Sequence, residues 1–227
     1  MFNNKALEKY INDYILKEYS KNDTGHGIDH IRYVMQRSVT FAKQVGNVDL
    51  DMVLTIAAYH DLGHHIDAKN HEKISAEILR NDQKLREFFT AEQIEIMAQA
   101  VEDHRASLKR KIRTIYGRIV STADRNVDIY EVLRRTYGYR LRHNPTDTVD
   151  KMIEDSRRHL IDKFGEKGYA NGKDYIDDQQ YKNFLIQLRE LTADKEKFRT
   201  TYLKANEITP SSYEVEEKPL QYVKKPS

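Results

Sequence analysis

Apolar residues recur every three or four positions along most of this chain, a spacing that predicts amphipathic α-helices. Residues 3–19 show the pattern, with apolar positions at Leu7, Ile11, Tyr14, Ile15 and Tyr19 that suggest an amphipathic helix. The alternation of apolar and polar residues that is typical of half-buried β-strands never continues for more than a few positions. The hydrophobic pattern therefore predicts an all-α protein.

Glycine and proline are scarce, with nine glycines and four prolines in 227 residues, so long segments run without interruption. Segment 52–63 is apolar on most of its faces and is expected to be a buried helix, with Asp49 or Asp51 as its N-cap. Helices are expected over residues 3–19, 28–46, 52–63, 72–81, 91–104, 115–137 with an interruption near Asp124, 147–164 and 177–206.

The length of the chain suits one large domain. We expect a single domain over residues 1–207, with a functional core over about 20–140 and additional C-terminal helices over 147–206 that serve as a lid or a dimer arm. If these C-terminal helices serve as a dimer arm, the protein forms a homodimer. Residues 208–227 contain three of the four prolines and predict a flexible tail.

The charges nearly balance, with 38 basic and 36 acidic side chains, so nucleic acid is not expected as the main partner, although 108–113 is locally basic. No apolar stretch is long enough to span a membrane, and the first residues lack the apolar centre of a signal peptide, so we expect a cytoplasmic protein. The absence of cysteine excludes disulfides and thiolate ligands. Any bound metal must therefore sit on nitrogen and oxygen.

The histidines are concentrated in one part of the chain. His60 and Asp61 follow the apolar helix directly and converge on one ion if the helix end is offset, which Gly63 permits. Asp124 follows a second apolar run and is expected near the core. Imidazole and carboxylate ligands together suit a divalent transition ion, and a set of two histidines and two aspartates leaves positions open for water or substrate. Seven of the nine histidines lie in this region: His26, His30, His60, His64, His65, His71 and His104.

The order His30, His60-Asp61, Asp124 resembles the HD-domain superfamily of metal-dependent phosphohydrolases, and 57-AAYHDLGHH-65 is similar to its small stand-alone bacterial members. The resemblance covers about residues 20–140. It implies an HD-domain helical bundle in which His30, His60, Asp61 and Asp124 bind Mn, Fe, Co or Zn, with or without Mg.

The resemblance also places His71 and His104 where related phosphodiesterases have histidines for a second metal or for the leaving group. Asp61 would bridge two ions or orient the attacking water, and His71 or His104 would donate a proton to the leaving oxygen. Asp61, His71 and His104 are therefore the expected catalytic residues. His64, one helical turn after His60, is left open between a neighbour of the site and a surface residue, whereas His65 is expected at the surface.

We expect a metal-dependent phosphohydrolase that uses metal-activated water, with manganese as one suitable ion, to cleave a phosphomonoester or phosphoanhydride of a small metabolite, foremost a nucleotide. Two alternatives stay open: a phosphodiesterase for cyclic or linear dinucleotides, and a non-catalytic HD module that senses a nucleotide. Several basic residues near the motifs in sequence are candidates for binding phosphate: Arg32, Lys69, Arg105, Lys109 and Arg125.

Overall fold

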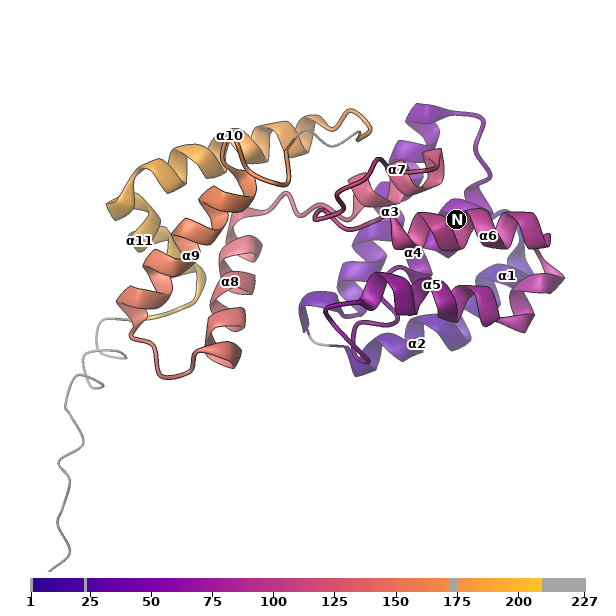
Figure 1. Ribbon diagram of the computed structural model, residues 1–227, viewed down its shortest axis with the longest axis horizontal. Coiled ribbons are helices and arrows are strands. Elements are labelled where there is room, and N and C mark those ends of the chain that lie inside the picture. The colour runs from indigo at the N-terminus through magenta and orange to yellow at the C-terminus, as the bar shows by residue number, and fades with distance from the viewer. Residues whose placement is uncertain (1, 23, 172–174, 210–227) are drawn as a thin grey trace, which may run out of the picture. The chain divides into compact units, whose positions relative to one another are not determined.

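The computed structural model describes residues 2–22, 24–171 and 175–209 (Figure 1). These residues form helices joined by turns and contain no β-strand, so the predicted all-α fold is confirmed. They divide into two compact units: residues up to Arg125 together with 175–179, and residues 126–171 together with 180–209. The single domain over 1–207 and its core over 20–140 stay predictions. Most of the predicted tail lies outside the described residues.

The N-terminal helical segment of the first unit consists of α1 (Lys5–Tyr10), a π-helical turn (Ile11–Ile15) and α2 (Leu16–Glu18). Asn4 caps α1, because its side-chain oxygen accepts hydrogen bonds from the backbone amides of Ala6 and Leu7. Leu7 and Ile11 are fully buried. The predicted amphipathic face therefore exists except at Tyr14, which is 65% exposed. The helix also changes its hydrogen-bonding register part of the way along.

Helix α4 (Leu50–Tyr59) is the centre of the first unit. Every residue from Met52 to Tyr59 is buried, and Asp49 caps the helix by accepting hydrogen bonds from the amides of Asp51 and Met52. The expected burial is confirmed, but the helix ends at Tyr59 because residues 60–66 form turns. Contacts with α4 come from α3 (Ile28–Val45), α5 (His71–Asn81), α6 (Ala91–Glu102) and α7 (Ile115–Ala123).

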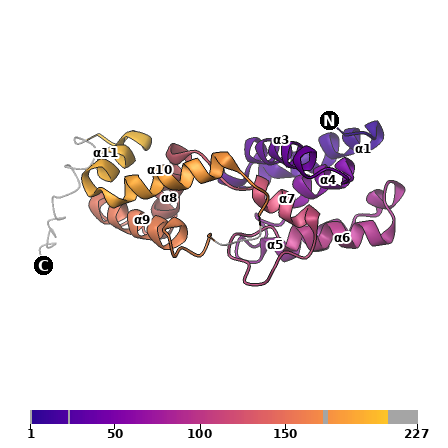
Figure 2. The same ribbon diagram turned by 90° about the horizontal axis from the view of Figure 1, so that it is seen from above.

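The second unit has its own hydrophobic core, to which Leu133, Leu160, Phe184 and Phe198 contribute. Its helices are α8 (Ile129–His143), α9 (Val149–Phe164), α10 (Gln179–Ala193) and α11 (Lys195–Ala205), as Figure 2 shows. Within the part of the chain that the structure describes, no helix is both long enough and apolar enough to cross a membrane.

Two of the predicted helices are each divided in two. The expected interruption near Asp124 is present, since α7 ends at Ala123 and Asp128 starts α8 by accepting a hydrogen bond from the amide of Glu131. The long helix expected over 177–206 is interrupted at Asp194, whose side chain caps α11 by accepting from the amide of Lys197. In both places a capping aspartate competes with helix continuation, which the hydrophobic spacing alone does not show.

Candidate metal centre

Helix ends of the first unit carry the predicted metal ligands. His30 lies in the first turn of α3, His60 directly follows α4, and Asp124 directly follows α7. His104 lies two residues beyond the end of α6. The partial negative charge at the C-terminal ends of α4, α6 and α7 favours a cation at the place where those ends meet.

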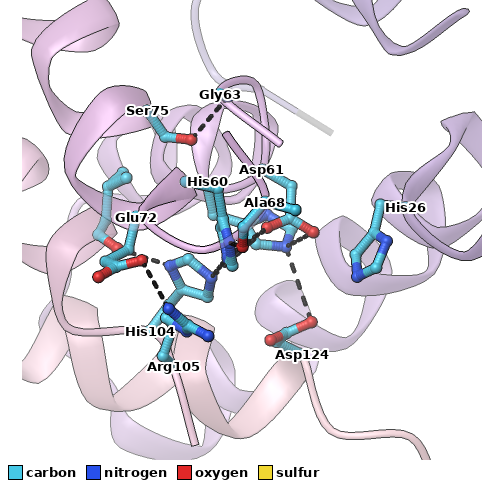
Figure 3. Close-up of polar contacts among 12 residues, drawn as sticks. His26, His60, Asp61, Gly63, Ala68, Glu72, Ser75, His104, Arg105 and Asp124 are labelled. Carbon is cyan, nitrogen blue, oxygen red and sulfur yellow. Dashed lines mark hydrogen bonds and ion pairs between the residues drawn. The ribbon is translucent and has the colours of Figure 1, made fainter. Parts of the chain in front are cut away.

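The four predicted ligands come together in space, as Figure 3 shows for His60, Asp61 and Asp124. Nε2 of His30 lies 3.1 Å from Oδ1 of Asp124 and 3.6 Å from Oδ2 of Asp61. Nε2 of His60 lies 3.4 Å from Oδ2 of Asp61 and 3.7 Å from Oδ1 of Asp124. Two imidazoles and two carboxylates therefore face one small volume.

His71 and His104 face the other oxygen of Asp61. Oδ1 of Asp61 lies 3.2 Å from Nε2 of His71 and 3.5 Å from Nε2 of His104. The two Nε2 atoms lie 3.1 Å from each other. The carboxylate of Asp61 thus lies between two pairs of imidazole rings. Its Oδ2 faces His30 and His60, and its Oδ1 faces His71 and His104.

Backbone contacts set the proton positions on three of these histidines. Nδ1 of His60 lies 2.8 Å from the carbonyl oxygen of Ala57, and the corresponding distances are 2.9 Å from His71 to Ala68 and 2.6 Å from His104 to Val101. A carbonyl can only accept, so each Nδ1 carries the proton and donates it. In the neutral ring, Nε2 is then left with a lone pair directed at Asp61, which is the orientation that a metal-binding histidine needs.

The site also contains nitrogen atoms whose hydrogen-bonding capacity is unused. Among the described residues, the buried Nε2 atoms of His30 and His60 make no hydrogen bond of normal geometry, although carboxylate oxygens lie close to both. Burying such atoms is costly unless another partner satisfies them. Inward-facing lone pairs on nitrogen, ionised carboxylates and the absence of thiolates together fit a divalent ion with nitrogen and oxygen ligands.

The neighbouring histidines keep the carboxylates of Asp61 and Asp124 ionised. Burial by itself would raise the pKa of Asp61, but His60 and His104 hold this pKa well below its usual value. Burial opposes ionisation of Asp124 in the same way, and His30 and His60 hold the pKa of Asp124 low. In the metal-free protein both carboxylates are therefore ionised at neutral pH.

His60 and His71 respond to this environment in opposite ways. Burial would lower the pKa of His60, but Asp61 and Asp124 raise it well above its usual value. Burial, reinforced by His104, lowers the pKa of His71 to about 4. At neutral pH and without metal, His60 is protonated and His71 is neutral.

Gly63 acts through close packing. A Cβ atom at position 63 would lie 2.7 Å from Cβ of Ile74 and 2.9 Å from the amide nitrogen of Ser75, which is closer than Cβ atoms approach their neighbours in proteins. The amide of Gly63 also donates a 2.9 Å hydrogen bond to Oγ of Ser75 (Figure 3). The absence of a side chain therefore lets the turn that carries Asp61 lie against the first turns of α5, which begins at His71.

Asn22 is a site-supporting residue that the sequence analysis missed. Its side-chain amide donates to the carbonyl oxygens of Asp61 and His26, both at 3.0 Å, and its Oδ1 accepts a 3.1 Å hydrogen bond from the amide of His65. Asn22 stands in a polar loop, and nothing in the local pattern separates it from ordinary loop residues.

His64 borders the cluster. Its ring stacks on that of His26 with centroids 3.7 Å apart, and lies 5.3 Å from the ring of His71. His65 is exposed, as expected. The alternative left open for His64 is thus resolved in favour of a neighbour of the site.

The candidate phosphate-binding residues differ in their surroundings. Arg105 donates to the carbonyl oxygen of Lys69 at 2.6 Å and pairs with Glu72 at 3.1 Å, so it is held beside His104 (Figure 3). Arg125 is buried, with its guanidinium over the ring of Tyr175. The other three candidates are exposed: Arg32, Lys69 and Lys109.

A helical unit with histidines and aspartates gathered at its helix ends has the chemistry of a domain that could hold a metal ion. Residues 27–126 match the family model described as HD domain, and this segment belongs to the HD-domain family, as the sequence resemblance predicted. HD domains are generally metal-dependent hydrolases. All six clustered residues fall inside the matched segment. No curated protein and no solved structure matches the chain.

Proposed function

We propose that the protein is a metal-dependent phosphohydrolase that acts on a small phosphorylated metabolite, with nucleotides as the substrate class. The observation that carries this proposal is the position of Asp61, which is 2% exposed. One of its carboxylate oxygens faces the pair His30 and His60, and the other faces the pair His71 and His104. A buried carboxylate between inward-facing nitrogen atoms suits the binding of divalent cations and the positioning of water near them.

His30, His60, Asp61 and Asp124 would hold the ion, and manganese, iron, cobalt or zinc would suit this ligand set. When bound, such an ion lowers the pKa of its water and stabilises negative charge on a phosphoryl oxygen. Asp61 would also orient the attacking water.

The low pKa of His71 limits the role that this histidine can take in the reaction. Because burial and His104 lower the pKa of His71 to about 4, His71 is neutral at pH 7 and offers a lone pair rather than a proton. His71 is therefore not the proton donor to the leaving oxygen in this proposal and is instead available to bind a cation or accept a proton. Arg105, held beside His104 by Glu72, supplies positive charge for a phosphate group.

The test is a turnover assay on the purified protein loaded with manganese, using nucleoside phosphates, sugar phosphates and cyclic and linear dinucleotides. We expect phosphate or pyrophosphate release from a nucleotide, and loss of both bound metal and turnover in Asp61→Ala. Cleavage of dinucleotides alone would favour the phosphodiesterase alternative. Nucleotide binding that persists in Asp61→Ala, with no turnover in the wild type, would favour a sensor and contradict the proposal.

A further inference from the structure

A segment outside the HD match packs beside the metal centre. Residues 175–178, which we call the strap, lie between α9 and α10 in the chain but belong to the first unit. The amide of Ile176 in the strap donates a 3.1 Å hydrogen bond to Oγ1 of Thr122 in α7. The side chain of Gln44 in α3 donates to the carbonyl oxygen of Asp177 at 3.2 Å. The strap is thus joined to the two helices that carry His30 and Asp124.

A buried ion pair also joins the strap to α3. Arg37 in α3 and Asp178 in the strap are 9% and 8% exposed, and the guanidinium of Arg37 forms a hydrogen-bonded ion pair with the carboxylate of Asp178. Nε of Arg37 also donates a 3.3 Å hydrogen bond to the carbonyl oxygen of Ala123, the residue before Asp124. Arg37 therefore connects the strap to the backbone that leads into a predicted metal ligand.

Arg125, the residue after Asp124, is also held by contacts with the strap and with α3. The guanidinium of Arg125 lies over the ring of Tyr175 in the strap, and the carbonyl oxygen of Arg125 accepts a 3.3 Å hydrogen bond from the hydroxyl of Tyr33. Asp124 is the C-cap of α7, where the regular helical hydrogen bonds end: its amide donates a 2.9 Å hydrogen bond to the carbonyl oxygen of Val120, and the amide of Arg125 donates a longer, 3.3 Å bond to that of Thr122.

We propose that the strap positions Asp124 for metal binding, with Asp178 and Arg37 as positioning residues that act from outside the ligand set. The proposal rests on the metal site of the proposed function. Loss of the Asp178 carboxylate would leave the buried guanidinium of Arg37 without its counter-charge, so Arg37 would turn away and release the carbonyl of Ala123. Loss of a contact that orients a metal ligand typically weakens metal affinity about 10-fold to 100-fold.

The experiment compares manganese affinity and metal-free melting temperature for the full-length wild type and its variants. Titration of manganese against the apoprotein should give about 10-fold weaker binding for Asp178→Asn. Tyr175→Ala should weaken binding in the same direction, while Tyr175→Phe, which keeps the ring under Arg125, should bind like the wild type. These two variants keep the proposal testable if Asp178→Asn does not fold.

The matched control is Leu7→Ala, a fully buried position of the same unit on α1. It should lower the melting temperature of the apoprotein and leave manganese affinity unchanged, which separates positioning from general destabilisation. Wild-type affinity in both Asp178→Asn and Tyr175→Ala would overturn the strap proposal. A wild type that binds manganese but hydrolyses no substrate would instead overturn the proposed function, and the affinities would still decide the role of the strap.

Discussion

The Nε2 atoms of His71 and His104 lie 3.1 Å apart while the Nδ1 atom of each ring is committed to a backbone carbonyl. Two neutral rings held in this way would point lone pairs at each other, so a proton or a cation must lie between them. In the metal-free protein, burial and His104 lower the pKa of His71 to about 4, which keeps the His71 ring neutral. Oδ1 of Asp61 lies within 3.5 Å of both nitrogen atoms, and a cation between the rings would satisfy the three groups together.

Replacing His71 or His104 should therefore remove only part of the bound metal. In His71→Ala and in His104→Ala, we expect lower metal stoichiometry and retained binding at His30, His60 and Asp124. Elemental analysis of the dialysed proteins, combined with manganese titration, measures both quantities. Unchanged stoichiometry in both variants would show that the pair holds a proton and no metal.

His60→Ala should be the most damaging single change at the centre. His60 is fully buried and faces both carboxylates, so its loss removes a proposed metal ligand and also the positive partner of the buried Asp61. We expect loss of bound metal and a free energy of unfolding lowered by about 3 kcal/mol in the metal-free protein. Urea unfolding in the presence of a chelator measures the stability. A variant that keeps wild-type stability would contradict the assigned charge on His60.

The metal-free protein should lose stability as the pH falls from about 6.5 toward 4. The pKa of His71 is about 4 in the folded protein and 6.5 in the unfolded chain, so the unfolded chain binds the proton first across this window. Stability from this group is complete above pH 6.5 and decreases as the pH falls, by up to about 3 kcal/mol. Thermal unfolding with chelator, from pH 7 to pH 4, should show a shallower slope for His71→Gln than for the wild type.

Gly63→Ala should weaken metal binding without touching a ligand. The added methyl group meets Cβ of Ile74 and the backbone of Ser75, so the turn that carries Asp61 and the start of α5 must separate. We expect lower manganese affinity and a lower melting temperature.

Gly138→Ala is the matched control for this change. Its Cβ would lie 3.6 Å from the nearest side-chain atom, an ordinary contact, and alanine favours the interior of α8 by about 1 kcal/mol over glycine. This variant should keep wild-type metal affinity and melt at the same or a higher temperature. Equal metal affinity in Gly63→Ala and Gly138→Ala would contradict the packing role of Gly63.

The sequence by itself was sufficient to predict the all-α fold and the residues that gather at the candidate metal site. Hydrophobic spacing depends on which side of a helix is buried, and this property is local, so α4 and its burial were predictable from residues 52–59 alone. The order of His30, His60-Asp61 and Asp124 was also sufficient to indicate the HD-domain family, which the match over 27–126 confirms.

Only the tertiary structure decided how those side chains meet. Helix packing determines that the ends of α4, α6 and α7 lie together, and backbone carbonyls determine which nitrogen of His60, His71 and His104 faces inward. The role of the strap was likewise not predictable from the sequence, because the contacts from Asp178 through Arg37 to Ala123 join residues far apart in the chain. Periodicity carries no information on such contacts, since they depend on the packing of whole helices and not on the burial of one face.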